Sequence, residues 1–232
     1  PLASDKSYLL PLKMSETSQE GFDLDENVCF LKVENPKYGT LDCDRSKWEV
    51  VFCNSDEKNA VSEPNGDKGG VGCLFDDDIN SYWHANWSGG TNNDDQFPQL
   101  FQGGREMPIT IVVDMKESLI VHSIGWTQRQ NSDYQDTKKV EYYVSDDEQF
   151  KLGGKEDYSP VALNNWTFVM ERSYQKGYNA TQWQTQSEEV LQKKVKGHLL
   201  KVKIVEGYRD RLASGAELYV KQLLAIDGEP IK

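Results

Sequence analysis

LFDDDINSYWHANW, residues 74–87, decides the fold we expect, because it places three consecutive carboxylates directly before a cluster of aromatic residues and one histidine. Residues 76–81 offer hard oxygen ligands at short spacing, which favours a turn that holds a hard cation such as calcium. Residues 82–87 set flat apolar faces beside hydrogen-bonding groups, a combination that suits sugars. The residues alone leave one alternative open, an acidic surface turn before a strand whose aromatic side chains are core.

The charge of the chain limits its partners. A formal net charge of -12 and an isoelectric point near 4.8, with no local cluster of Lys and Arg, repel phosphate backbones and anionic lipid heads. We therefore expect neither nucleic acid nor an anionic membrane as a partner. The 232 residues contain no apolar run of the length that a membrane span needs, and they suffice for one substantial domain with additional material.

Cysteine usage and aromatic content point to the cell exterior. No CxxC pair is present, so a zinc site is not expected. Two disulfides or buried thiols both remain open for the four cysteines. Many glycines, tyrosines and tryptophans at low overall hydrophobicity are typical of a loop-rich extracellular β protein. The cysteines are Cys29, Cys43, Cys53 and Cys73.

Alternating apolar residues predict mostly strands. Residues 1–45 read as an N-terminal β segment with strands in 6–18 and 27–35, possibly the tail of a preceding domain, and residues 46–232 as the main domain. A polar insertion, 174–197, has room for two helical turns with Ser187 as N-cap. The strands expected in the main domain lie within 47–57, 108–115, 123–133, 139–147, 166–173, 198–206 and 218–228.

The signature stretch resembles that of the coagulation factor 5/8 C-terminal domain, also called the discoidin domain, whose sugar-binding branch is the family 32 carbohydrate-binding modules. Their pattern is Asp-Gly-Asp, Thr or Ser, an aromatic residue, Trp-His and a second Trp. Asp77 stands where the family has glycine, and because Asp tolerates a left-handed backbone we expect the turn to be kept. The matching residues are Asp76, Asp77, Asp78, Ser81, Tyr82, Trp83, His84 and Trp87.

Two further strings extend the resemblance to about 180 of the 232 residues. VEYYVSDD is similar to the family's tyrosine-x-valine-serine-aspartate turn, and Asp114 matches an aspartate-leucine-glycine strand in which this chain has Met115 and Lys116. The resemblance implies an all-β fold, an eight-stranded antiparallel jelly-roll β-sandwich. It also implies core positions for Trp166 and for the tyrosines of VEYYVS.

Non-catalytic carbohydrate binding is the function that the resemblance implies, at the surface of a bacterial cell or in its periplasm, in a protein that is lipid-anchored when complete. Only three histidines are present, and the sequence has no nucleophile elbow, phosphate loop or metalloprotease helix, so we do not expect an enzyme. Two alternatives stay open. The chain is an appended module of a larger glycoside hydrolase, or it is a cell-adhesion or protein-binding discoidin domain.

The resemblance also implies a structural calcium ion. Its ligands would be Asp76, Asp78, Ser81 and a glutamate on the closing strand. Glu217 matches that glutamate by local string, whereas counting back from Gly228 places Gln222 nearer.

The implied sugar site centres on His84 and on Arg129 in TQRQNSD, the residues that galactose-type members use. The fork of an arginine grips two vicinal hydroxyls. An asparagine that the family has a few residues later is missing here, and the alternative for Arg129 is a salt bridge to a loop carboxylate. Trp87 is the candidate stacking face. Tyr134, Tyr208 and Arg211 are candidates for the rim, and the ligand would be a galactose-type or host glycan.

Overall fold

The computed structural model describes residues 37–57, 69–87, 107–148 and 165–231, and the backbone of two strands at 7–13 and 28–34. The chain divides into two compact units. One consists of residues 1–39 with 224–232, and the other of residues 40–223. The predicted division at residue 45 stays a prediction.

The first unit contains the predicted N-terminal strands. β1 (Ser7–Lys13) and β2 (Val28–Glu34) pair antiparallel, with Ser7 opposite Glu34 and Lys13 opposite Val28. At its other end, β13 (Glu229–Pro230) pairs with the last residues of β12 (Glu217–Ile226). A turn between them has Asp227 and Gly228 at positive φ, 53° and 85°.

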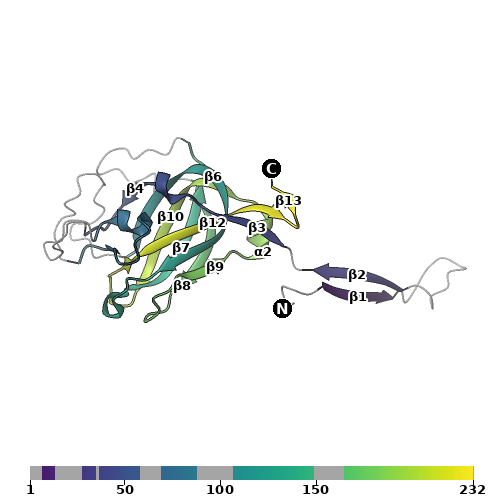
Figure 1. Cartoon of the computed structure of the whole chain (residues 1–232), viewed down its shortest axis with the longest axis horizontal. Helices are drawn as coiled ribbons and strands as arrows, with labels where there is room; N and C mark the ends of the chain where they lie inside the picture. The colour runs from purple at the N-terminus through teal and green to yellow at the C-terminus, as the bar shows by residue number, and fades with distance from the viewer. Residues whose placement is uncertain are drawn as a thin grey trace, which may run out of the picture. The chain divides into compact units, whose positions relative to one another are not determined.

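One long strand, β6 (Ile109–Thr127), organises the second unit. Its first half pairs with β10 (Lys196–Gly207) and β4 (Glu49–Cys53), and its second half with β12 and β9 (Gln182–Thr185). Because its partners change along its length, β6 joins both layers of the sandwich, and the strands curl around it (Figure 1). The sequence predicts two separate strands here, so the continuity of β6 is a correction.

Nine of the described strands form one antiparallel sheet, to which β3 (Tyr38–Asp42), β7 (Thr137–Ser145) and β8 (Thr167–Ser173) belong. Its order is β13-β12-β6-β10-β7-β8, with β3, β4 and β9 paired at its sides. β5 (Trp83–His84) and β11 (Ser214–Gly215) form a separate short pair. The α-helical part of the described chain is short, and its helix α2 (Glu188–Gln192) begins at the predicted N-cap Ser187, whose hydroxyl accepts from the Val190 amide at 3.4 Å.

The predicted all-β sandwich is therefore confirmed, and it contains strands that the sequence did not reveal, among them β9 and β3. β9 lies inside the polar insertion, where Trp183 pairs opposite Gly125, and β3 precedes the expected start of the domain. A glycine is needed at 125 because a Cβ there would lie 3.0 Å from the Trp183 ring. No helix in the described ranges is both long and apolar enough to cross a membrane.

Both non-glycine residues at the family's glycine positions keep a left-handed backbone. Asp77 has φ 62° and Lys116 has φ 64°. The Lys116 amide donates to the Asp114 carboxylate at 2.8 Å, and its ammonium group contacts Glu49 at 2.6 Å. These contacts stabilise a conformation that costs an ordinary residue about 1 kcal/mol or more.

The core lies between the layers, and large aromatic side chains dominate it. Trp83, Trp126 and Tyr142 are fully buried, and the core position expected for the tyrosines of VEYYVS is confirmed for Tyr142. The hydroxyl of Tyr142 lies 2.6 Å from that of Tyr174, so each buried hydroxyl has a partner. Burial raises the pKa of Tyr174, which keeps the phenol neutral.

Trp166 and Tyr143 lie outside this main core. Trp166 is partly buried against a small cluster of Phe52, Val112 and Leu199. The Lys201 ammonium group lies 4.5 Å from the centre of the Tyr143 ring and 4.4 Å from that of Trp166. Tyr143 and Trp166 are therefore only partly buried, and the core positions expected for them are not confirmed.

The described cysteines are thiols. Cys43, Cys53 and Cys73 form no disulfide, which favours the thiol alternative for this part of the chain. Burial raises the pKa of Cys43 to about 12 and makes its thiol unreactive at neutral pH. The side chain of Cys29 lies outside the described residues.

We expect Tyr142→Ala to lower the free energy of unfolding by about 3–5 kcal/mol, because it leaves a cavity in the main core and an unpaired Tyr174 hydroxyl. Tyr143→Ala, one position along β7, should cost less, since its ring is partly exposed. Urea denaturation of both variants measures the difference. Equal losses of unfolding free energy would contradict the placement of Tyr142 in the main core and of Tyr143 outside it.

Candidate functional site

A buried polar segment after β4 holds the end of the signature loop in place. The Ser55 hydroxyl accepts from the Asn86 amide at 2.9 Å, and the Glu57 carboxylate accepts from the Trp87 amide at 2.8 Å. The Ser55 carbonyl also accepts from the indole of Trp83 at 3.2 Å. Residues 54–57 are all buried, so the backbone that presents Trp87 has a fixed support.

His84 is buried at the start of the candidate site. Its Nδ1 lies 2.6 Å from the Ala85 carbonyl and its Nε2 lies 3.3 Å from the Asp136 carboxylate. The side chain is 5% exposed. Because both ring nitrogens face acceptors, the ring holds the surrounding backbone and Asp136 in position.

Asp136 is the centre of this network. The carboxylate is fully buried and accepts two hydrogen bonds from Arg209, at 2.5 and 2.6 Å. Burial by itself raises the pKa of Asp136, but hydrogen bonds from Arg209 and His84 outweigh it and hold the pKa below its ordinary value. The amide of Asp136 donates to the Ser214 hydroxyl at 3.2 Å, which ties the carboxylate to β11.

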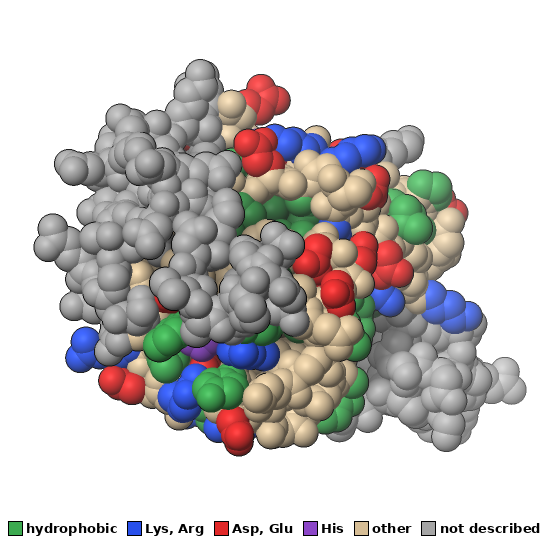
Figure 2. All heavy atoms as spheres, turned by 60° about the vertical axis from the view of Figure 1, so that its left-hand side comes forward, with side chains coloured by type: hydrophobic (Ala, Val, Ile, Leu, Met, Phe, Trp, Pro, Cys, Tyr) green, Lys and Arg blue, Asp and Glu red, His purple; other side chains and the backbone are tan. Residues whose placement is uncertain are grey.

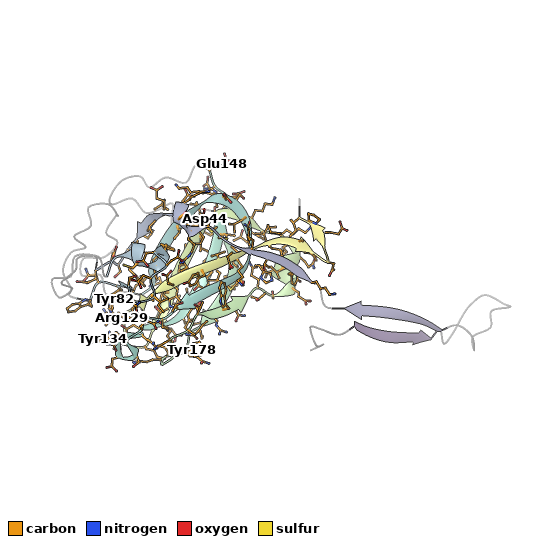
Figure 3. All side chains as sticks on the ribbon, viewed as in Figure 1. Asp44, Tyr82, Arg129, Tyr134, Glu148 and Tyr178 are labelled. Carbon is orange, nitrogen blue, oxygen red and sulfur yellow. The ribbon has the colours of Figure 1, made fainter. Side chains whose placement is uncertain are left out.

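Two arginines stack on tyrosine rings beside this network. The guanidinium carbon of Arg129 lies 3.5 Å from the centre of the Tyr82 ring and 4.8 Å from that of Tyr134. Arg209 lies 4.8 Å from the same Tyr134 ring. Tyr82, Arg129 and Tyr134 lie together at one end of the second unit (Figure 3). Stacking uses the face of a guanidinium and leaves its N–H donors in the plane.

Figure 2 shows the face that lies on the left in Figure 1. A histidine is visible there among basic and hydrophobic side chains, and acidic side chains lie nearby. Tyr134 is 40% exposed and Trp87 is 42% exposed, whereas Tyr82 is buried. Exposed aromatic rings beside arginine donors are the two elements that a sugar ring needs, an apolar face and directed hydrogen bonds.

The predicted insertion supports the same site. Gln135 is fully buried, and its amide donates to the Arg129 carbonyl at 3.0 Å and to the Asn179 side chain at 2.6 Å. Its side-chain oxygen accepts from the Gly177 amide at 2.5 Å. Residues 177–179 therefore hold the loop that carries Arg129 and Tyr134.

The structure joins three of the predicted sugar-site residues in one network, His84, Arg129 and Tyr134. Trp87 is exposed as expected, at the end of the same signature loop. Arg211 is exposed, and its guanidinium lies 3.7 Å from the neighbouring Asp210. Its role stays a prediction.

The sequence analysis missed Tyr82, Asp136 and Arg209 as site residues. Tyr82 belongs to the signature, and its position before Trp-His was the available signal. GYRDR contains two arginines two residues apart, and nothing in the sequence chooses between them. The choice depends on Asp136, which lies 73 residues away in the chain.

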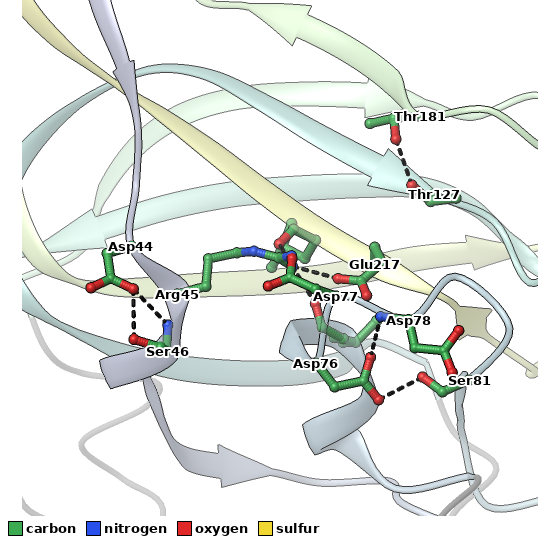
Figure 4. Close-up of polar contacts among 12 residues, drawn as sticks. Asp44, Arg45, Ser46, Asp76, Asp77, Asp78, Ser81, Thr127, Thr181 and Glu217 are labelled. Atoms are coloured by element: carbon green, nitrogen blue, oxygen red, sulfur yellow. Dashed lines mark hydrogen bonds and ion pairs between the residues drawn. The ribbon is translucent and has the colours of Figure 1, made fainter.

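The acidic turn is a compact set of side-chain to backbone hydrogen bonds (Figure 4). The Asp76 carboxylate accepts from the Asp78 amide at 2.9 Å and from the Ser81 hydroxyl at 2.7 Å. The Asp78 carboxylate accepts from the Asn80 amide at 2.9 Å. All the side-chain types expected in the turn are thus brought together.

Glu217 reaches the turn from the closing strand. It lies opposite Thr127 on β6, whereas Gln222 lies opposite Val121, further along the strand pair. Burial raises the pKa of Glu217 to about 7, and the negative charge of Asp76 adds to this effect, against the lowering by Arg45. One of its oxygens is buried and has no hydrogen-bond partner.

A buried arginine contacts one of the four expected calcium ligands, Glu217. Arg45 donates to the carboxylates of Asp77 and Glu217 and to the carbonyls of Leu74 and Leu218. Within the described ranges no three Asp, Glu, His or Cys side chains converge as a metal site. The residues present do not fit a calcium ion beside this guanidinium. Calcium binding stays a prediction that the geometry does not support.

We expect Asp136→Asn to lower the free energy of unfolding by about 1.5–3 kcal/mol at pH 7, at the smaller end because Arg209 is partly exposed. The lowered pKa of Asp136 stabilises the fold above the ordinary value of 3.8, and this is lost as the pH falls through the folded-state value. The difference between wild type and variant should therefore shrink in acid. Denaturation at several pH values measures it, and a constant difference would contradict the ion pair.

Comparison with known proteins supports the fold. No family model and no curated protein matches the chain. A solved C-terminal domain of a chitobiase from Bacteroides fragilis is 18% identical, with a TM-score of 0.57 over 80% of this chain and 100% of that domain.

Two modules from Clostridium perfringens are also similar. CpGH89CBM32-5, solved with GalNAc-β-1,3-galactose, is 17% identical, with a TM-score of 0.55 over 78% of this chain and 99% of the module. The family 32 module of NanJ, solved with galactose, is 18% identical, with a TM-score of 0.53 over 79% and 99%. At these identities the likeness shows the fold, which is the discoidin-like sandwich expected from the sequence.

Proposed function

We propose that this chain, whose fold is that of discoidin domains and family 32 carbohydrate-binding modules, binds a glycan without catalysing a reaction on it. The binding surface is the loop edge formed by Arg129, Tyr134 and Trp87. One observation carries the proposal, the stacking of Arg129 on Tyr82 and Tyr134, because it places a rigid donor fork beside an exposed ring.

The stacked arginine suits vicinal hydroxyls. A guanidinium presents parallel N–H donors that match two neighbouring oxygens. Stacking and the hydrogen bond from Gln135 to the Arg129 carbonyl fix the loop before a ligand arrives, so less conformational entropy is lost on binding. The C–H face of a sugar ring packs on the exposed rings of Tyr134 and Trp87.

His84 acts through Asp136 in this account. Its ring is buried and both nitrogens face acceptors, so it holds Asp136, which in turn holds Arg209 beside Tyr134. The role carried over from the family, a direct contact between His84 and the sugar, stays a prediction.

Galactose-type sugars are the ligands that we propose. Two modules of similar fold were solved with galactose and with GalNAc-β-1,3-galactose. A single shallow site with a few hydrogen bonds and one stacked ring should bind a monosaccharide with a Kd of about 1 mM, near -4 kcal/mol.

We place catalysis outside this chain. The similar chitobiase domain from Bacteroides fragilis is described as the C-terminal domain of that protein, which favours the appended-module alternative. A surface protein without an enzyme domain would bind a glycan through the same residues. We propose an extracytoplasmic location at the bacterial cell surface or periplasm for either arrangement.

Replacing Arg129 by Ala should weaken binding of galactose and N-acetylgalactosamine by roughly 10- to 100-fold, because it removes a charged donor worth about 1.5–3 kcal/mol. Tyr134→Ala should weaken the binding of both sugars less than Arg129→Ala does, since it removes only part of the stacking surface. Lys138→Ala is the control, an exposed cation on β7 whose ion-pair partner is Glu206 at 2.8 Å.

Isothermal titration with galactose, N-acetylgalactosamine and glucose measures these effects, after circular dichroism has shown that each variant is folded. If folded Arg129→Ala binds every sugar as well as wild type does, the site lies elsewhere. Residues 174–197 are then the next segment to test.

A further inference from the structure

Arg45 is a buried arginine that the sugar site does not use. It lies in the short 3₁₀ helix η1 (Arg45–Lys47), between β3 and β4, and is 7% exposed. The Asp44 side chain caps this helix by accepting from the Ser46 amide at 3.1 Å. The cap fixes the backbone that directs Arg45 into the acidic turn (Figure 4).

The guanidinium of Arg45 contacts four oxygen-bearing groups. Its NH1 donates to the carbonyls of Leu74 at 3.1 Å and Leu218 at 2.9 Å, and to the Glu217 carboxylate, while NH2 donates to the Asp77 carboxylate. Backbone carbonyls and carboxylates together are the set that a hard cation takes from a protein. Here an arginine takes them.

Electrostatics gives this contact its importance. Glu217 is fully buried, and the turn beside it carries the three consecutive carboxylates Asp76, Asp77 and Asp78, so negative charge is concentrated near a buried carboxylate. A buried carboxylate is costly unless a cation pairs with it. Arg45 provides that charge, and its guanidinium carbon also lies 4.1 Å from the centre of the Tyr219 ring.

We propose that the Arg45 guanidinium, by pairing with Glu217 and the neighbouring carbonyls, takes the role of the calcium ion that the resemblance implies, so that this loop edge is built without a metal. The departure at Asp77 has the same explanation. A glycine there has no side chain, whereas Asp77, at φ 62°, supplies a carboxylate to Arg45. Arg45 and Asp77 thus act together: the guanidinium, which is part of the chain, replaces a calcium ion that could dissociate.

The proposal makes removal of the arginine informative. Without the guanidinium, the oxygens of Asp77, Glu217, Leu74 and Leu218 face a common position with no positive charge, and one Glu217 oxygen already has no hydrogen-bond partner. These are ligands for calcium, which takes six to eight oxygens and completes its shell with water. Arg45→Ala should therefore gain a response to calcium that wild type does not have.

Melting temperatures in millimolar calcium chloride and in EDTA test this directly. Wild type should melt at the same temperature in both and hold no calcium by elemental analysis. Arg45→Ala should melt roughly 10 °C lower in EDTA, because a buried charge loses its partner. Calcium should restore about 5 °C of this loss if the new site has a Kd of about 10 µM.

Lys47→Ala is the matched control, since Lys47 lies in the same 3₁₀ helix but its side chain is 63% exposed. It should change neither the melting temperature nor the response to calcium. Adding Glu217→Gln to Arg45→Ala should abolish the calcium response and recover part of the lost stability, because it removes the unpaired charge.

Two results overturn the proposal. One is a wild type that binds calcium and melts lower in EDTA, and the other is an Arg45→Ala variant that melts like wild type or gains no response to calcium. If Arg45→Ala folds only in calcium, the proposal is supported. If the variant does not fold at all, the calcium content and melting temperature of the wild type still test the proposal. The readout is thermal, so its outcome is independent of whether the chain binds a glycan.

Discussion

Two buried carboxylates, each paired with an arginine from a distant segment, fix the loop edge of this sandwich. Asp136 accepts from Arg209, and Glu217 accepts from Arg45, across 73 and 172 residues of chain. Both carboxylates are fully buried, so each depends on its arginine. Asp136 lies in the network that contains His84, Arg209 and Tyr134, and Glu217 lies beside the acidic turn of the signature stretch.

The long strand β6 is the frame on which these pairs meet. Its second half lies opposite β12, which places Glu217 beside Thr127, and the chain continues from Thr127 to Arg129. The acidic turn, the stacked Arg129 and the insertion therefore gather at one end of a single strand. A rigid scaffold that positions exposed loop residues is the usual arrangement of a binding site.

The sandwich was expected from the resemblance that the signature of fourteen residues carries, whereas the strands and the Ser187 cap were predicted from local sequence patterns. These patterns placed Arg129 within an expected strand, 123–133, whereas β6 ends at Thr127 and Arg129 lies in the loop that follows. Asp136, Arg209 and Arg45 could not be predicted, because each role depends on a partner far away in the chain. The continuity of β6 was hidden for another reason, since Lys116 adopts the left-handed backbone that normally calls for glycine. The role of Asp77 could not be predicted either, because its partner Arg45 lies outside the signature stretch.

The central claim is that a stacked arginine at the loop edge recognises a sugar without a metal. Its most direct test is a titration of the ¹⁵N-labelled protein with GalNAc-β-1,3-galactose in EDTA, observed by NMR at the arginine Nε–H and tryptophan Nε1–H groups. The account predicts that the signals of Arg129 and Trp87 shift with the ligand, while that of Trp183, which is 39% exposed on β9, does not. Shifts at Trp183 without any at Arg129, or binding that disappears in EDTA, would contradict it.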